Sequence, residues 1–194
     1  KVRLVVTEFA HGHHADATDA DNPRVRWRYD PKQAGVSAQF ADCGIHALHM
    51  ASFVTGEEVE RLSADTVSLI ASRVLEDDAM VNFRMTGGVV GRLWTSSVAI
   101  GRQHGLAIQL FGETGGLRWS QEQPNQLYWM PLGQRLHGGH QMAKAAPEPV
   151  ELPDDERIAG TERFEAGLKA RAVILLARCF VEVDVAFDNA SGQQ

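Results

Sequence analysis

The sequence predicts an α+β fold, in which helices cover one face of an open, mainly antiparallel sheet. Short runs of alternating apolar and polar residues extend from Val2 to Met130, and glycine-rich reversals at 86–88 and 112–116 separate several of them. Period-two runs joined by tight reversals are typical of antiparallel strands. A long apolar segment from about Ser37 to Val54 indicates a helix layer, because a sheet face must be buried against another element.

The strands are expected at residues 2–9, 57–70, 79–85, 89–100, 106–111, 117–121 and 126–130. From residue 79 onward they follow one another through short turns, which predicts an antiparallel meander. A polar loop over 11–35 joins the first strand to the helix. A loop of this length inside a compact domain usually has a function.

The chain divides into two parts by composition. At 194 residues it is long enough for one domain, or for one domain with an extension. Residues 1–133 are expected to form the α/β domain. Residues 134–194 change character: prolines and an acidic cluster indicate a linker, and a possible helix at 161–179 and strand at 180–187 follow. The chain opens inside a strand without a methionine, so we expect a further segment upstream.

Composition excludes several classes of function. The formal charge of -6 and the absence of a basic run argue against binding to nucleic acid. No apolar run approaches the roughly 18 residues that a membrane span requires, and no secretory signal is recognisable. Two cysteines, Cys43 and Cys179, are too few for a disulfide framework, so a cytoplasmic location is expected.

The segment Asp42-Cys43-Gly44-Ile45-His46 is the strongest candidate for a site. Asp42 and His46 are four residues apart, which places them on one side of a helix, and His49 falls near the same line. The surrounding residues are apolar, so the segment is expected to be buried, where unpaired polar groups are costly. One interpretation is a carboxylate that satisfies a core histidine. The other is an acid/base pair at the floor of a substrate pocket.

Four segments resemble one family in their sequence and in their order along residues 1–133. They are the opening strand Lys1-Val2-Arg3-Leu4-Val5, Trp27-Arg28-Tyr29-Asp30-Pro31, the helical Ala41-Asp42-Cys43-Gly44-Ile45-His46 and the turn Phe111-Gly112-Glu113-Thr114-Gly115-Gly116-Leu117. Together they resemble the C-terminal domain of the Gfo/Idh/MocA oxidoreductases, the group of glucose-fructose oxidoreductase and inositol dehydrogenase. The resemblance implies the fold of a glucose-fructose oxidoreductase-like C-terminal domain.

The resemblance also implies an activity. The chain would be the substrate-binding and catalytic half of an NAD(P)-dependent oxidoreductase that acts on a hydroxyl of a sugar, a polyol or a similar compound. His46 would take the hydroxyl proton while Asp42 orients the substrate. Trp27, Arg28 and His49 would lie near the substrate or the cofactor.

The dinucleotide-binding Rossmann domain of the family is absent from this sequence, and no Gly-x-Gly-x-x-Gly motif is present. NAD or NADP is therefore expected in the full-length protein, with none bound to this chain alone, which is expected to be inactive. His49 stands where many relatives carry an aspartate, which bears on the substrate class. The open sheet face, with Met80, Val90, Trp94 and Val98, is expected to form a homodimer or tetramer interface.

Two other functions remain open. The chain could be a non-catalytic sugar-binding or assembly module that retains the sheet without the cofactor half. Alternatively, a metal-binding domain could use the ligand types that the sequence supplies. Those residues are His13, His14, Asp42, His46 and His49, with His11 beside them.

Overall fold

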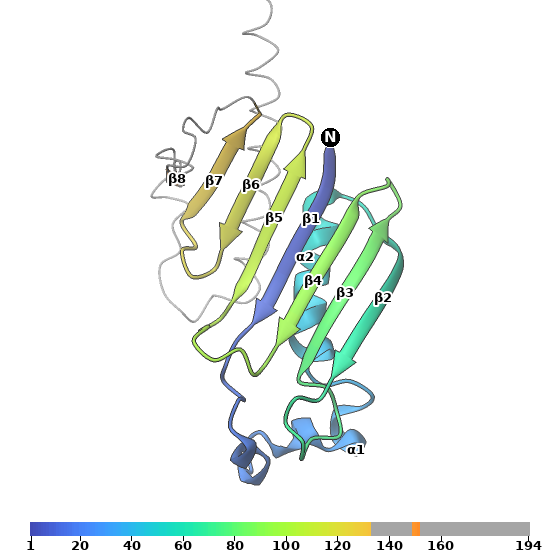
Figure 1. The fold of residues 1–194 in the computed structure, drawn as a ribbon, viewed down its shortest axis with the longest axis vertical. Coiled ribbons are helices and arrows are strands. Elements are labelled where there is room, and N and C mark those ends of the chain that lie inside the picture. The colour runs from blue at the N-terminus through green and yellow to red at the C-terminus, as the bar shows by residue number, and fades with distance from the viewer. Residues whose placement is uncertain (133–148, 152–194) are drawn as a thin grey trace, which may run out of the picture.

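The computed structural model describes residues 1–132 and 149–151. Within them, eight strands form a single sheet in the order β2-β3-β4-β1-β5-β6-β7-β8 (Figure 1). The strands are β1 (Val2–Ala10), β2 (Val59–Val67), β3 (Asp78–Met85), β4 (Val90–Ser96), β5 (Leu106–Gly112), β6 (Gly115–Ser120), β7 (Gln126–Pro131) and β8 (Pro149–Glu151). The helix α2 (Ile45–Thr55) crosses behind β1 and β4 on one face (Figure 1). The expected α+β class is confirmed.

The sheet departs from a simple meander at its centre. β1 pairs parallel to β4 on one side and antiparallel to β5 on the other, so β4 and β5 are separated by the first strand of the chain. Val5, for example, lies opposite Gly91 of β4 and Leu110 of β5. The expected antiparallel pairing holds for β2–β3–β4 and for β5–β6–β7. The alternating pattern identifies strands, but it does not say which strands are neighbours.

The helix begins later than the sequence suggests. A short π-helix, η3 (Phe40–Gly44), leads directly into α2. Before it, the Glu76 carboxylate accepts hydrogen bonds from the Ser37 hydroxyl and from the backbone N–H groups of Ala38 and Phe40. This distant carboxylate satisfies N–H groups that have no partner within the helix, as an N-cap does. At the other end Gly56 takes a left-handed conformation with φ of 68° and caps α2, as expected.

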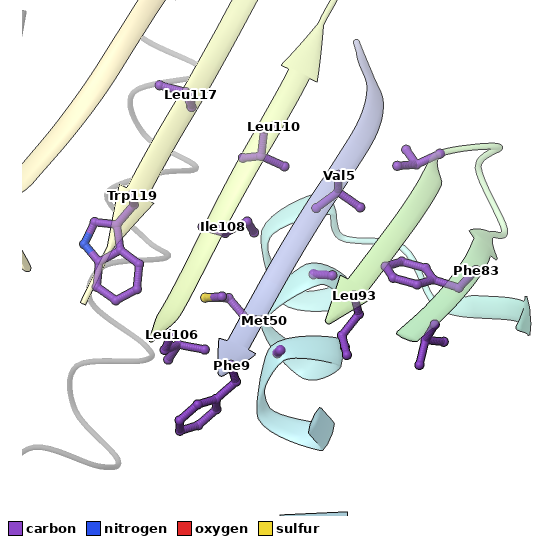
Figure 2. Close-up of a cluster of buried hydrophobic side chains, with 14 of the residues drawn as sticks. Val5, Phe9, Met50, Phe83, Leu93, Leu106, Ile108, Leu110, Leu117 and Trp119 are labelled. Carbon is purple, nitrogen blue, oxygen red and sulfur yellow. The ribbon is translucent and has the colours of Figure 1, made fainter. Parts of the chain in front are cut away.

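The core lies between α2 and the face of the sheet that the helix covers (Figure 2). Figure 2 shows Met50 of α2 reaching toward the strands, where Val5, Leu93 and Leu106 lie. The buried members of this core are Val5, Phe9, Cys43, Ala47, Met50, Ala51, Val81, Phe83, Met85, Val89, Leu93, Leu106, Ile108, Leu110, Leu117, Trp119 and Leu127. Full burial of one large apolar side chain contributes about 1.5–3 kcal/mol, so this cluster is the main source of stability for the described part of the domain.

The loop between β1 and the helix contains short helices: η1 (Ala17–Asp21), η2 (Arg26–Tyr29) and α1 (Pro31–Ala34). Further along, β8 pairs antiparallel with β7, so a short strand occupies part of the expected linker. A proline at the start of an outermost strand fits that position, because it has no N–H to donate. The expected helix at 161–179 and strand at 180–187 lie outside the described residues. No helix among the residues described is long and apolar enough to cross a membrane.

Gly105 marks a close approach of two backbones just before β5. Its φ is +72°, and a Cβ at this position would overlap the carbonyl oxygen of Ala10. Gly35 also has a positive φ, of +89°, but nothing lies within 4 Å of the place of its missing Cβ. Substituting each of the two glycines therefore distinguishes the cost of backbone strain from the cost of steric overlap.

We expect Gly105→Ala to lower the free energy of unfolding by about 2–5 kcal/mol, because left-handed strain adds to the cost of overpacking. Gly35→Ala should cost about 1–3 kcal/mol, for backbone strain alone, because its φ of 89° and ψ of −144° suit few residues other than glycine. Urea unfolding of both variants measures the difference. Equal losses would show that the contact with Ala10 relaxes without cost.

Candidate active site

The candidate residues lie on the exposed side of the helical segment, outside its buried contact with the sheet. Asp42, His46 and His49 are all exposed, and the exposed fractions of Ile45 and Phe53 beside them are 46% and 45%. The expectation that the segment is buried all round is therefore wrong. α2 forms a single layer, so just one of its faces contacts the sheet, and apolar residues on its other face remain at the surface. Asp42 and His46 consequently face outward, and burial does not force them to pair with each other.

Asp42 forms an ion pair with Arg28 from the loop after β1. The Arg28 guanidinium also lies over the ring of Trp27, 4.7 Å from its centroid. The structure thus brings together Trp27, Arg28 and Asp42, which the sequence places in two separate motifs. Both members of the ion pair are partly exposed, so the pair contributes at most about 1 kcal/mol to stability. Its main effect is to fix the direction of the Asp42 carboxylate.

Arg73 anchors the loop that carries Trp27 and Arg28. Its side chain is 1% exposed and forms an ion pair of 3.3 Å with Asp77. The same guanidinium donates to the carbonyl oxygens of His14 and Asp16 and lies 4.5 Å from the centroid of the Tyr29 ring. A buried charge with this many partners fixes its neighbours, because any displacement would leave it unpaired. No motif or spacing around Arg73 marks it in the sequence.

His11 lies buried at the end of β1, underneath the candidate residues. Its Nε2 is 3.6 Å from the Sγ atom of Cys43, and its ring stacks on that of His13 with centroids 4.7 Å apart. Burial, reinforced by the neighbouring His13, His14 and His104, lowers the pKa of His11 from 6.5 to about 4, although the Asp42 carboxylate opposes this shift. His11 is therefore neutral near pH 7.

His46 is near this group as well, because the centroid of its ring lies 6.1 Å from that of Phe9. Phe9 in turn stacks on His104, with centroids 4.9 Å apart. The site is thus built on the end of β1. His46 projects from the helix above Phe9, and the loop carrying Arg28 meets the helix at Asp42.

The histidines considered as metal ligands lie partly together, with the rings of His11 and His13 stacked, but they do not form a metal site. Across residues 1–132 and 149–151, no three His, Cys, Asp or Glu side chains are grouped so that they could hold a metal ion. His14 is hydrogen-bonded to Asp19 at 2.8 Å. His49 instead lines a shallow groove of about 540 Å³ between α2 and the start of β2. The five-residue metal site considered from the sequence does not form.

The sequence of this chain contains no Gly-x-Gly-x-x-Gly motif, which dinucleotide-binding turns use to bring the backbone close to the pyrophosphate. The glycine-rich segment at 112–116 is the tight turn of the β5–β6 hairpin instead. This turn is therefore not the strand-to-helix turn that binds a pyrophosphate in dinucleotide-binding domains.

The fold and the arrangement of these residues define a class of domain. The family model described as the GFO/IDH/MocA C-terminal domain matches residues 1–118. The chain therefore belongs to the Gfo/Idh/MocA family, and the matching region includes Trp27, Arg28, Asp42 and His46.

Individual relatives agree with this assignment. The chain is 31% identical over 136 residues to the uncharacterized oxidoreductase YfiI of Bacillus subtilis (strain 168), a match that covers 69% of this chain and 35% of the relative. An inositol dehydrogenase homolog from Azotobacter vinelandii, solved with NAD+, has a TM-score of 0.70 at 30% identity, covering 92% of this chain and 45% of that one.

The same Azotobacter vinelandii homolog solved with NADH and myo-inositol gives a TM-score of 0.65 at 28% identity, covering 92% of this chain and 44% of that one. The chain therefore spans between a third and a half of the length of these relatives.

The buried neutral His11 predicts a specific dependence of stability on pH. Its pKa is about 4 in the fold, against 6.5 ordinarily. Below pH 6.5 the unfolded chain therefore takes up the proton first. Stability contributed by His11 is complete above that pH and is lost as the pH falls toward 4. We expect a loss of about 2 kcal/mol between pH 7.5 and pH 5 from this residue.

Urea unfolding of the wild type and of the His11→Asn variant at the two pH values tests this dependence. The variant should have a lower stability at pH 7.5 and a flatter dependence on pH, by about 2 kcal/mol over this interval. An unchanged dependence in the variant would show that His11 is not the responsible group.

Proposed function

We propose that this chain is the substrate-binding and catalytic half of an NAD- or NADP-dependent oxidoreductase that acts on a hydroxyl of a sugar, polyol or similar compound. Family membership supports an oxidoreductase, and the Azotobacter vinelandii homolog was solved with NADH and myo-inositol. The observation that carries the proposal is the outward-facing pair of Asp42 and His46, with Arg28 fixing the carboxylate. The two cysteines in the sequence favour a reducing cytoplasm as its location.

In this proposal His46 acts as the general base. An imidazole is suited to this role near pH 7, because its ordinary pKa lies close to that value. His46 would accept the proton of the substrate hydroxyl at a ring nitrogen. Asp42, held by Arg28, would accept a hydrogen bond from the same or a neighbouring hydroxyl and so orient the reacting carbon.

A nicotinamide cofactor supplies a hydride acceptor when it is bound. Because the sequence has no Gly-x-Gly-x-x-Gly motif, we place the cofactor on a dinucleotide-binding domain that would cover the outer face of α2. Ile45 and Phe53 on that face are available for such a contact. This chain by itself is then expected to bind no cofactor and to be inactive.

The other predicted residues have distinct places in the proposal. Trp27, whose side chain is partly exposed, and Arg28 would form the wall of the substrate pocket on the loop side, where a guanidinium can bind hydroxyl oxygens. His49 lies a further turn along α2, in the groove that Phe53 also lines. We assign it to the part of the pocket nearer the cofactor.

The central test is His46→Ala in the full-length protein, assayed first with myo-inositol and NAD+ and then with a panel of polyols and sugars. Loss of a general base should lower kcat by roughly two to four orders of magnitude. Arg24→Ala is the control, because Arg24 is exposed in the same loop as Arg28 and is outside the proposed site. Its kcat should stay near that of the wild type.

A fully active His46→Ala variant would remove the proposed role of the imidazole. Full-length protein that binds a polyol without oxidising it, in wild type and variant alike, would instead favour a non-catalytic binding module.

The open face of the sheet is proposed as a subunit interface. Met80 is 59% exposed there, and with Trp94 it borders a hollow of about 330 Å³. Val90 lies on the same face, beside Leu4 of β1. Val98, expected as a fourth member, lies beyond the end of β4 at Ser96, so the strand does not place it on this face. An exposed apolar sheet face favours association with a second copy.

We expect Met80→Arg to weaken dimerisation of the full-length protein by about tenfold or more, because a charge would be buried at the centre of the interface. Val36→Arg is the matched control, because Val36 is 98% exposed in the loop before the helix. Sedimentation equilibrium measures both dissociation constants. Equal constants for Met80→Arg and the wild type would exclude this face as the interface.

A further inference from the structure

β2 forms an exposed edge of the sheet. It is the outermost strand on its side, and residues 60–67 are all exposed. Its outward backbone N–H and C=O groups have no partner strand within the described part of the chain. Leu62 and Val67 are 50% and 42% exposed along this edge. A long edge with unpaired backbone groups and exposed apolar side chains is a template for pairing with another strand.

The sequence of this edge is complementary to itself in one antiparallel register. We call residues 61–65 the β2 edge, because an irregularity between Val59 and Arg61 ends the regular pairing there. If two copies meet with Ser63 opposite Ser63, Arg61 of each copy faces Asp65 of the other. Leu62 of each copy then faces Ala64 of the other. The arrangement contains two opposite-charge pairs, two apolar pairs and no like-charge pair.

The faces of the sheet agree with this register. Arg61, Ser63 and Asp65 pair with residues of β3 on the open face, whereas Leu62 lies opposite Phe83, which belongs to the core on the helix side. A two-fold axis perpendicular to the sheet keeps each face on its own side. Charges therefore meet charges on the open face, and the exposed Leu62 meets apolar partners on the helix side.

Neighbouring registers lack these features. Opposed residues must lie on the same face of the sheet, so the two-fold axis must pass through a residue and not between two residues. The neighbouring registers are therefore those in which the axis passes through another residue of the edge. Centring the pair on Leu62 places Arg61 opposite Ser63, and centring it on Ala64 places Asp65 opposite Ser63. Centring it on Arg61 or on Asp65 opposes two like charges, which is destabilising.

We propose that the β2 edge binds a second copy of this chain, antiparallel and two-fold symmetric about Ser63, so that two sheets join into one. The occupant is a second copy because the charge pattern of the edge complements its own reversed sequence. This surface is different from the open sheet face. A protein that uses both contacts would be a tetramer, and one that uses the edge alone would be a dimer.

Charge reversal in the full-length protein tests the proposal. With Arg61→Asp, both pairs between positions 61 and 65 would consist of two carboxylates. With Asp65→Arg, both pairs would consist of two guanidinium groups. Each single variant should weaken the edge contact by roughly tenfold or more. The double variant Arg61→Asp/Asp65→Arg restores two opposite-charge pairs and should regain most of the affinity. Sedimentation equilibrium of all four proteins, repeated in a Val90→Arg background, separates the edge from the sheet face, because Val90 lies on β4, which does not pair with β2.

A cysteine at the axis gives a second measurement that does not depend on charge. Ser63→Cys places two thiols opposite each other, with Cβ atoms about 4.5–5.5 Å apart, so mild oxidation should cross-link the copies. Thr66→Cys is the control, because its two copies would be separated by roughly 20 Å along the strands. Association that is insensitive to charge reversal, a double variant no better than the singles, or equal cross-linking at positions 63 and 66 would overturn the proposal.

Discussion

The close contact between α2 and the centre of the sheet determines how the rest of this domain is arranged. Ala47 and Ala51 are completely buried there, and their small side chains let the helix backbone lie near the central strands. Packing at interior density then fixes which side of the helix faces outward. Asp42 and His46 face outward for this reason, although the apolar residues around them suggest a fully buried segment.

The central position of β1 has a second consequence. Because β1 ends between β4 and β5, the loop that follows it starts beside the helix and can return over it. Arg73 and Glu76, both on the connection between β2 and β3, bind this loop and the start of the helical segment. Arg73 fixes the loop through His14, Asp16 and Tyr29, and Glu76 fixes the start of the helical segment. One short connection therefore positions both halves of the candidate site.

The helix, the sheet face and the sheet edge of the described domain each expose apolar side chains. The outer face of α2 exposes Ile45 and Phe53, the open sheet face exposes Met80, and the β2 edge exposes Leu62. Exposed apolar side chains gathered on one element mark contact surfaces more often than chance. A domain that spans less than half of its solved relatives is expected to have such surfaces. In our proposals a dinucleotide-binding domain covers the first, and further copies of the chain cover the others.

The sequence by itself determined the strands β1 to β7, the turns at 86–88 and 112–116, the cap at Gly56 and the family, because these depend on local periodicity and short motifs. It also placed Arg28 and Asp42 in the two motifs that meet. Tertiary structure alone decided that β1 separates β4 from β5, that one helix face stays exposed, and that Arg73 and His11 are buried around the site. Each of these depends on contacts between residues far apart in the chain, for which a single sequence contains no periodic or local signal.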